Sequence, residues 1–468
     1  MPDPAPRLLR ESDVSAAAGC LHRWYLECHG AGRADEARDP ADDFFKRHCV
    51  SWLPDLREPA WDGRDPAAGG RETARLMAQG PAWIFRGILA AEGMLGRPDL
   101  LRRMERPSAL GAFSYVPAAL KRRSTPVESS DVRELQFHAL LLEPLLGERP
   151  SSGWVYRPDG SAEEIDLRAT RPAFETLIAD LERIRRGDLR TEGYRWTGCR
   201  RCPWRQHCTT VWTQLSHVCL LPGMDTADVG AFRDGGYASW RAVAAATPEL
   251  LAQRVGLPLP LARFLWLHAK AFQSRRPLVI QPAPFPRDLP VHFYAPEFRY
   301  GRCYLHGDLR VEGGEIRVRQ FLASSTAQEG AAWHALLDHL ARDPRALVFS
   351  WTDRLDTPLE ALWNRHGGNP RGWRHLSRGR RSLHRFLREQ VILPLSDYGL
   401  REVGSYFSVK WSARSPAAGI FPSPWEREQA FPDITSTRTI LDANRERIEA
   451  MKTIYFALQR MQEFGCAA

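Results

Sequence analysis

The chain has 468 residues, of which 43% are hydrophobic, together with 9 cysteines and a formal net charge of +9. This length exceeds what one ordinary hydrophobic core supports, so two or three domains are expected. No stretch approaches the length of an uninterrupted apolar membrane span, the first ten residues lack a signal-peptide core, and the cysteines are clustered rather than spread as a disulfide framework. We therefore expect a soluble cytoplasmic protein.

The positive charge comes almost entirely from arginine, because only five of the 65 basic residues are lysine. A basic balance favours a phosphate-bearing partner such as nucleic acid. An arginine-rich and lysine-poor composition also follows from a GC-rich genome. The charge supports nucleic-acid binding without establishing it.

The first predicted element is a helix that Ser12 or Asp13 can cap and that leads to Cys20. A second helix carries His48, and Asp99 follows a Gly-x-x turn that leads into a strand. The remaining elements expected before residue 150 are a helix over 72–77, strands over 82–89 and 113–121, and a helix over 130–146.

Three cysteines in a C-x2-C-x5-C run, Cys199, Cys202 and Cys208, are the strongest motif of the chain. A metal centre usually needs a fourth ligand, and Cys20 is the best candidate. Four thiolates hold a 4Fe-4S cluster. Zinc is the alternative, although its sites usually pair two short motifs and no second pair occurs here. Unliganded thiols fit poorly with the arginines around the run, which suit thiolate anions: Arg195, Arg200, Arg201 and Arg205.

In this order of elements, residues 1 to about 210 resemble the RecB family of PD-(D/E)XK nucleases, in the iron-sulfur branch that includes the CRISPR adaptation exonucleases. That branch has a histidine on an early helix, an aspartate after Gly-x-x, a (D/E)-x-K on the next strand, a glutamine on the following helix, and one cysteine matched to a distant trio. The matching residues are His48, Asp99, Lys121, Gln136, Cys20, Cys199, Cys202 and Cys208. The resemblance implies a nuclease-like domain over residues 1–215 that is closed by a four-cysteine 4Fe-4S cluster.

One position departs from the family pattern. In this fold two carboxylates, helped by the histidine, hold the divalent ions that polarise the scissile phosphate. The second acid of the family falls on Ala119, whose methyl group cannot coordinate a cation. Glu128 or Asp131 would have to replace it from beyond the strand. We therefore expect a vestigial catalytic site at His48, Asp99, Lys121 and Gln136, in which Asp99 and His48 are the remaining ligands for Mg or Mn.

Residues 216–284 have the pattern of short helices joined by glycine turns. They form either a helix-hairpin-helix module, which can cradle a phosphate at helix amino termini, or a plain structural linker. A helical segment at this place resembles the one that joins the two halves of long RecB-like proteins.

Residues 285–468 are predicted to be α/β. The expected strands lie over 290–294, 302–309, 314–322 and 346–351, and the expected helices over 329–340, 359–366 and 442–461. Similar long proteins carry an RNase H-like domain here, which needs acids on its first strand, midway and on its last helix. The nearest residues are Glu297, then Asp353 or Asp356, then Glu446 between two arginines after Asn444. This second site is also expected to be eroded.

The expected function is that of an iron-sulfur nucleic-acid-binding protein derived from a nuclease, weak or inactive in cleavage, with DNA favoured over RNA. One alternative is an active metal-dependent DNA exonuclease of repair or defence, whose missing acid comes from elsewhere in the chain. Another is a scaffold subunit of a nucleoprotein complex, in which protein partners are bound and the basic surface is incidental.

Overall fold

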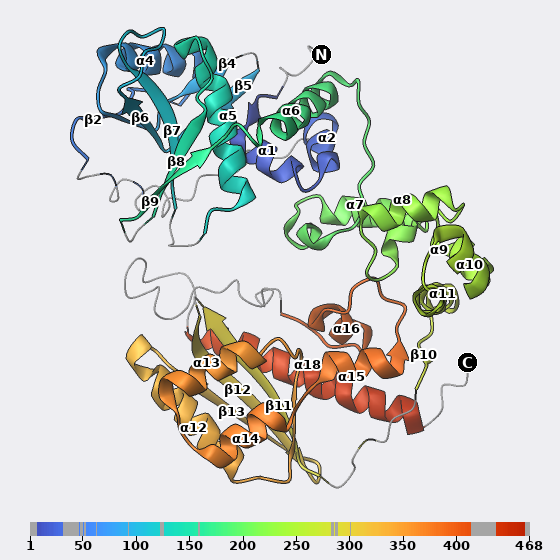
Figure 1. Ribbon diagram of the computed structural model, residues 1–468. Helices are drawn as coiled ribbons and strands as arrows, with labels where there is room; N and C mark the ends of the chain where they lie inside the picture. Colours follow the sequence, from blue (N-terminus) through green and yellow to red (C-terminus); the bar gives the residue numbers. More distant parts are fainter. Residues whose placement is uncertain are drawn as a thin grey trace. The chain divides into compact units, whose positions relative to one another are not determined.

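The computed structural model describes residues 7–30, 46, 50, 53–61, 63–91, 93–121, 126–157, 160–281, 285, 289–299, 301–412 and 437–463. The chain is a mixed α/β protein that divides into two compact units, Met1–Thr209 and Thr210–Ala468 (Figure 1). Within the described ranges, no helix is both long and apolar enough to cross a lipid bilayer.

A six-stranded sheet forms the centre of the first unit. Its strand order is β2-β3-β6-β7-β8-β9. Strands β3, β6 and β7 are antiparallel neighbours, whereas β8 is parallel to β7. A parallel pair needs a crossover connection, which helix α5 (Ser129–Leu146) supplies. The strands are β2 (Leu56–Arg57), β3 (Trp83–Phe85), β6 (Leu100–Met104), β7 (Ser114–Leu120), β8 (Ser152–Tyr156) and β9 (Ala162–Asp166).

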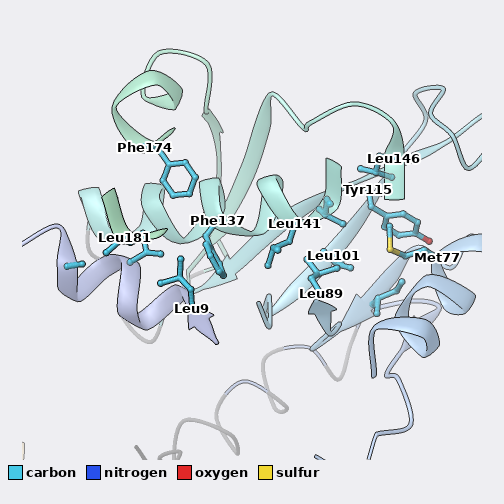
Figure 2. Close-up of a cluster of buried hydrophobic side chains, with 14 of the residues drawn as sticks. Leu9, Met77, Leu89, Leu101, Tyr115, Phe137, Leu141, Leu146, Phe174 and Leu181 are labelled. Atoms are coloured by element: carbon cyan, nitrogen blue, oxygen red, sulfur yellow. The ribbon is translucent and has the colours of Figure 1, made fainter. Parts of the chain in front are cut away.

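Helix α5 carries much of the core of the first unit. Its side chains Phe137, Leu141 and Leu146 lie among buried residues of the sheet, such as Leu101 and Tyr115 (Figure 2). The same cluster includes residues of α1, α4 and α6, so one hydrophobic core joins the sheet to these helices. The other elements of this unit are β1 (Leu9–Arg10), α1 (Glu11–Ala17), α2 (Leu21–His29), α4 (Pro66–Gln79), β4 (Leu89–Ala91), β5 (Met94–Gly96), α6 (Arg171–Arg186) and the 3-10 turn η1 (Thr197–Arg201).

The strand and helix predicted over 113–121 and 130–146 are confirmed as β7 and α5. The single strand predicted over 82–89 is wrong, because the chain turns between β3 and β4. Arg86 lies in the left-handed region with φ of 54°, and Ile88 donates its backbone N–H to Thr73 Oγ1 at 2.8 Å. An apolar run shows where a chain is buried, but it does not reveal a turn inside the run.

The second unit begins with helices, as predicted. After α7 (Arg205–Gln214), which crosses the unit boundary, come α8 (Thr226–Asp234), α9 (Trp240–Ala245), α10 (Pro248–Val255) and α11 (Leu259–Ser274). Side chains of Asp225, Ser239 and Thr247 cap α8, α9 and α10 by accepting backbone N–H groups. Gly256 ends α10 with φ of 76°. Whether these helices form a helix-hairpin-helix module stays a prediction.

A five-stranded sheet with the order β13-β12-β11-β14-β15, surrounded by helices, forms the rest of the second unit. Strands β11, β12 and β13 are antiparallel, and β14 and β15 continue parallel to β11. Their bounds are β11 (Val291–Arg299), β12 (Arg302–Glu312), β13 (Glu315–Leu322), β14 (Leu347–Ser350) and β15 (Arg380–Ser382). The four strands and three helices predicted over residues 290–461 are therefore confirmed. The helices and short strands around the sheet are β10 (Leu278–Val279), α12 (Glu329–Ala341), α13 (Asp356–His366), α14 (Pro370–Arg378), α15 (Leu383–Gln390), β16 (Val391–Ile392), α16 (Leu400–Tyr406) and α18 (Thr437–Glu463).

Two separate hydrophobic cores lie on the two faces of this sheet, and alternating residues of β11 point into one or the other. Val291 and Phe293 of β11 pack with α18, whereas Tyr294 packs with α12 and α14. This alternation is the period of two expected for a strand that is buried on both sides. The face of a polar residue in β11 or β12 therefore determines which helix it meets.

Glu329, at the start of α12, holds this helix to β12 and α13. Its carboxylate is fully buried and accepts hydrogen bonds from the Cys303 backbone N–H at 2.8 Å, Arg365 at 2.6 Å and His366 at 3.0 Å. Burial alone would raise its pKa, but the hydrogen bonds from His366, Arg365 and Cys303 hold the pKa at about 2. A buried charge held this way is costly to neutralise.

Replacing Glu329 with glutamine is expected to lower the free energy of unfolding by about 3 kcal/mol, because cationic partners lose their counter-charge. The contribution of the carboxylate is complete above its ordinary pKa of 4.5 and is lost as the pH falls toward 2. Urea denaturation measures the change. Glu315→Gln is the control, since its exposed ion pair with Arg317 should contribute less than about 0.5 kcal/mol. Equal effects of the two substitutions would contradict the prediction.

Candidate functional site

Strand register places Asp99 opposite Ala119. In the antiparallel pair of β6 and β7, Leu100 pairs with Ala118 and Leu101 with Pro117. The next step of this register sets Asp99, which directly precedes β6, beside Ala119. Cβ atoms of residues opposed in this way lie about 4.5–5.5 Å apart. A second carboxylate at position 119 would therefore share a cation with Asp99, but the position carries a methyl group.

The Asp99 carboxylate is occupied by protein groups on both oxygens. Its Oδ1 accepts a hydrogen bond from Lys46 Nζ at 2.7 Å, and its Oδ2 accepts the Leu120 backbone N–H at 2.9 Å. Asp99 is buried, with 8% of its surface exposed. The ammonium group of Lys46 thus lies where a divalent ion bound to Oδ1 would lie.

Ala119 belongs to an apolar cluster beneath α5. It is 6% exposed and packs with Leu135, Ala139, Val155 and Leu167. The methyl group of Ala119 is therefore accommodated by hydrophobic packing. A carboxylate introduced here would have to be compensated by a bound cation.

The other predicted site residues have partners of their own. Lys121 Nζ binds Asp131 Oδ2 at 2.5 Å and the Pro126 carbonyl at 2.9 Å. Gln136 is buried and donates to the Leu167 carbonyl at 2.5 Å and to Thr170 Oγ1 at 2.8 Å. The same oxygen of Asp131 also accepts the Glu128 backbone N–H, within the cap of α5, so Asp131 is tied to Lys121 and to the helix start. His48 lies outside the described residues.

The structure adds acidic groups that the sequence reasoning missed. Glu134 of α5 has a pKa raised to about 8, chiefly by burial and then by the nearby Asp99 carboxylate. Burial also raises the pKa of Glu11 in α1, and Asp99 adds to that effect. A carboxyl group with a pKa near 8 is mostly protonated at neutral pH. Glu134 lies two residues before Gln136, so a helical-face analysis that started from Gln136 would not have selected it.

His138, one turn after Glu134, is also buried near Lys46. Its pKa is lowered to about 3 by burial and then by Lys46, and its Nε2 atom has no hydrogen-bond partner. The Lys46 ammonium group therefore binds the Asp99 carboxylate, the Glu134 carboxyl group lies near Asp99, and the His138 imidazole lies near Lys46. This environment compensates Asp99 without a metal ion.

In the first unit, Cys20 and the three cysteines of the C-x2-C-x5-C run lie near enough for their charges to affect one another's pKa. Burial raises the pKa of Cys20, and Cys199 and Cys202 raise it further by their charge. The pKa of Cys208 rises to about 12, from burial first and then from Cys202, Cys20 and Cys199. Thiols that repel one another as thiolates form a site that a positively charged metal centre would stabilise.

Local structure positions each of these cysteines. Cys20 is the N-cap residue of α2, and the nearby backbone N–H groups of His22 and Arg23 offset part of the rise in its pKa. Cys199 lies in η1, and Cys208 lies in the first turn of α7. The indole of Trp196 packs against Gly19 and Gly198, which precede Cys20 and Cys199, and a Cβ atom at either glycine would clash with it. The two glycines therefore leave room for the Trp196 ring beside the backbone that precedes Cys20 and Cys199.

A second buried acid of interest lies in the second unit. Glu297 of β11 is 5% exposed and forms an ion pair with Arg447 of α18, whose pKa burial lowers to about 10. Asn444, fully buried one turn earlier, donates to Glu297 Oε1 at 3.2 Å and to the Ala295 carbonyl at 2.9 Å. A Cβ atom on Gly307 would overlap the Asn444 amide, so β12 needs glycine there. Glu297 and Asn444, which the sequence placed at the second site, are therefore in contact. The Arg447 guanidinium occupies the position beside Glu297 where a metal ion would bind.

The other acids named for this unit do not join Glu297. Asp353 pairs with Arg385, and Asp356 pairs with Arg380. Glu446 accepts the Ser412 backbone N–H at 3.3 Å, and its other carboxylate oxygen is buried without a hydrogen-bond partner. Each of the acids expected to hold metal is therefore engaged with the protein itself.

Comparison with known proteins gives no independent assignment of this arrangement. No protein-family model matches the chain, and no curated protein matches it either.

Proposed function

We propose that the protein is an iron-sulfur nucleic-acid-binding protein built on two nuclease-like domains that no longer hold catalytic metal. The observation that carries the proposal is common to both units. The acid at each expected metal position, Asp99 or Glu297, forms an ion pair with a basic side chain, Lys46 or Arg447. A protein cation on a carboxylate occupies the oxygen that a divalent ion needs. Neither position then supplies the two-carboxylate site that metal-assisted hydrolysis requires.

The topologies of the two sheets support this origin. In the first unit, three antiparallel strands are followed by helix α5 and a strand parallel to the third. This arrangement and the opposition of Asp99 to position 119 agree with a PD-(D/E)XK core. In the second unit, three antiparallel strands are followed by two strands parallel to the first, with α18 against the sheet. That order agrees with an RNase H-like domain.

The grouping of the cysteines supports a 4Fe-4S cluster. Cys20 and the run from Cys199 to Cys208 lie at opposite ends of the sequence of the first unit, yet their charges affect one another's pKa. Four thiolates are the ligand set of such a cluster, in which each sulfur binds one iron. When bound, the cluster would link the start of α2 to the start of α7.

Nucleic acid is the proposed partner because of the net charge of +9 and the ancestry that the two sheets suggest. Binding through arginine and phosphate is expected to weaken by about a thousandfold or more between 50 and 200 mM salt if six or more phosphates are contacted. Sequence preference should be small, because phosphate contacts carry no base information. Fluorescence anisotropy with labelled single-stranded and branched DNA at several salt concentrations measures both properties. Absence of binding to DNA and RNA at low salt would favour the scaffold function instead.

A second candidate function is supported by Glu134. Its carboxyl group is near enough to Asp99 for their repulsion to contribute to its raised pKa. If a divalent ion displaced Lys46 and the Glu134 proton, Asp99 and Glu134 would form a carboxylate pair. The protein would then be an active metal-dependent DNA exonuclease, with α5 supplying the acid that β7 lacks.

A further inference from the structure

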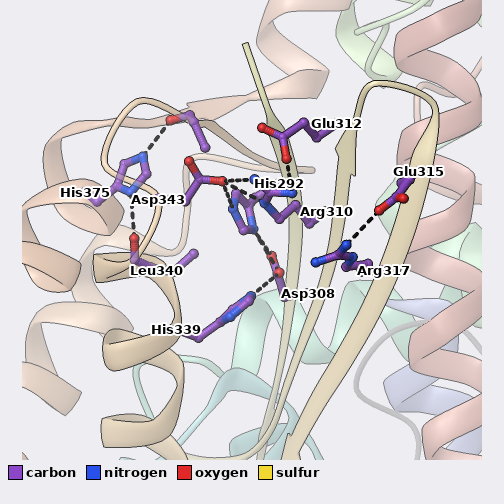
Figure 3. A network of polar contacts seen from close by, with 11 residues as sticks. His292, Asp308, Arg310, Glu312, Glu315, Arg317, His339, Leu340, Asp343 and His375 are labelled. Atoms are coloured by element: carbon purple, nitrogen blue, oxygen red, sulfur yellow. Dashed lines mark hydrogen bonds and ion pairs between the residues drawn. The ribbon is translucent and has the colours of Figure 1, made fainter.

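Three side chains from three elements converge on the α12 face of the sheet in the second unit. They are His292 of β11, Asp308 of β12 and His339 of α12 (Figure 3). One potential ligand atom of each lies within 4.8 Å of the other two. No other group of three histidine, cysteine or acidic side chains meets this condition in the part of the chain that the structure describes.

The geometry of the cluster is centred on Asp308. Its Oδ2 lies 2.8 Å from His292 Nδ1 and 2.9 Å from His339 Nε2. Asp308 and His292 are fully buried, and the His339 side chain is 13% exposed. Two imidazole nitrogens and one carboxylate oxygen form a donor set that zinc and related divalent transition ions accept. These ligands are distinct from the acids of the expected nuclease sites: Asp99 lies in the first unit, and Glu297, on the same strand as His292, pairs instead with Arg447 of α18.

A second observation concerns the far side of the His292 ring. Its Nε2 atom is buried without a hydrogen-bond partner, 3.6 Å from Asp343 Oδ2. Arg310 holds this carboxylate through Nη2 at 2.6 Å. A neutral imidazole that donates its Nδ1 proton to Asp308 would turn the lone pair of Nε2 toward a carboxylate. A cation on Nδ1 instead leaves the proton on Nε2, which then faces Asp343. Metal-bound histidines usually have a carboxylate or carbonyl in this outer position.

We propose that His292 Nδ1, Asp308 and His339 Nε2 bind one divalent transition ion of the zinc type, with Asp343 orienting His292 from behind. Bonds of about 2.0–2.1 Å in a tetrahedral site separate the ligand atoms by about 3.3 Å. The two Asp308–histidine separations of 2.8 and 2.9 Å would therefore open by about half an ångström on binding. Because the three ligands come from β11, β12 and α12, the ion would fasten α12 to the sheet. This site is independent of the cysteines and of nucleic-acid binding.

Cobalt(II) titration of the full-length, chelator-treated, cluster-loaded protein tests the proposal. Cobalt gives visible absorption bands when it is bound in a site of this type. Thiolate ligands add a charge-transfer band in the near ultraviolet, so binding to cysteines is recognised and separated. We expect one equivalent of cobalt to bind without the thiolate band, and one equivalent of zinc to displace it.

Three variants give the test its controls. His339→Gln removes a ligand, and Asp343→Asn removes only the outer carboxylate. His334→Gln is the matched control, because His334 lies on the same helix and instead meets the His366 carbonyl. We expect cobalt affinity to fall about 10–100-fold in Asp343→Asn and further in His339→Gln, and to stay unchanged in His334→Gln. Asp343 is partly exposed, so its variant keeps the test usable if His339→Gln fails to fold.

Two results would overturn the metal site. The first is the absence of any cobalt equivalent free of thiolate absorption in the unmodified protein. The second is equal cobalt affinity in His339→Gln and His334→Gln. Either result would mean that His292 and His339 only donate hydrogen bonds to the buried Asp308 carboxylate.

Discussion

Anaerobically purified protein is expected to be brown and to carry about four irons per chain, and Cys20→Ser is expected to lose both properties. The same substitution should lower the thermal midpoint of the first unit by about 10–20 °C. A cross-link that closes a loop of more than 100 residues contributes about 4.7 kcal/mol by the loop-entropy estimate. A domain of this size changes its midpoint by about 2–4 °C per kcal/mol. Iron analysis, visible absorption and calorimetry measure these effects.

Cys28→Ser provides the matched control for this prediction. Cys28 lies on α2, the helix that begins directly after Cys20, and packs against the core of the first unit. Its pKa is raised to about 12 by burial, and the charges that also act on it come from residues outside the proposed cluster. We expect this variant to keep its iron and its colour. Stoichiometric zinc in the unmodified protein, without visible absorption, would replace the iron-sulfur proposal with a zinc site.

Introducing an acid at position 119 while removing Lys46 is expected to create a metal site. In Lys46→Ala/Ala119→Asp, two carboxylates face each other across β6 and β7, and no ammonium group lies on Asp99. Without metal the variant should be less stable than the unmodified protein, because a buried carboxylate lacks compensation. Manganese at about 100 times its dissociation constant should then recover about 2.7 kcal/mol. Thermal midpoints with and without Mn²⁺ measure this recovery.

Lys46→Ala/Ala118→Asp is the control with the same change of charge. Ala118 neighbours Ala119 on β7 and is equally buried, but it packs with Phe85 and Leu100 on the opposite face of the sheet. This variant should lose stability and show no recovery with Mn²⁺. Equal responses of the two variants would mean that the effect of the metal is unrelated to Asp99.

Regular patterns of the sequence predicted several of the longer helices and strands. The apolar periodicities of α5, α12 and α18 and the apolar runs of β11 and β12 indicate these elements without tertiary information. The turn at Arg86 was missed, because an apolar run on both sides of it is also the pattern of one buried strand. Tertiary contacts of Gly87 and Ile88 with Thr73 determine the turn there.

The cysteine set is the site prediction that depends least on tertiary contacts. Cysteines have few other roles at such spacing, so the sequence predicts a site of Cys20, Cys199, Cys202 and Cys208, and in the structure the charges of these thiols affect one another's pKa. The partners of the acids were not predictable. Lys46 meets Asp99 and Arg447 meets Glu297 only through the fold, across 53 and 150 positions of the chain.

The cluster of His292, Asp308 and His339 was missed for a related reason. Each residue lies on a different element, and only strand pairing and the packing of α12 bring them together. A signal was present in the sequence, since His292 and Asp308 interrupt apolar strands at positions that are buried on both faces of the sheet. Polar residues at such positions need partners, which makes them worth examining before a structure is known.

Loss of catalysis with retention of binding is tested most directly by measuring cleavage in the same samples that bind nucleic acid. Cluster-loaded protein is incubated with labelled single-stranded DNA and Mn²⁺ at low salt, and Lys46→Ala/Ala119→Asp is measured in parallel. We expect the unmodified protein to bind the DNA and to cleave it at a rate at least about a thousandfold below that of an intact two-carboxylate site. Metal-dependent cleavage by the unmodified protein that is abolished by Asp99→Ala and by Glu134→Gln would contradict it.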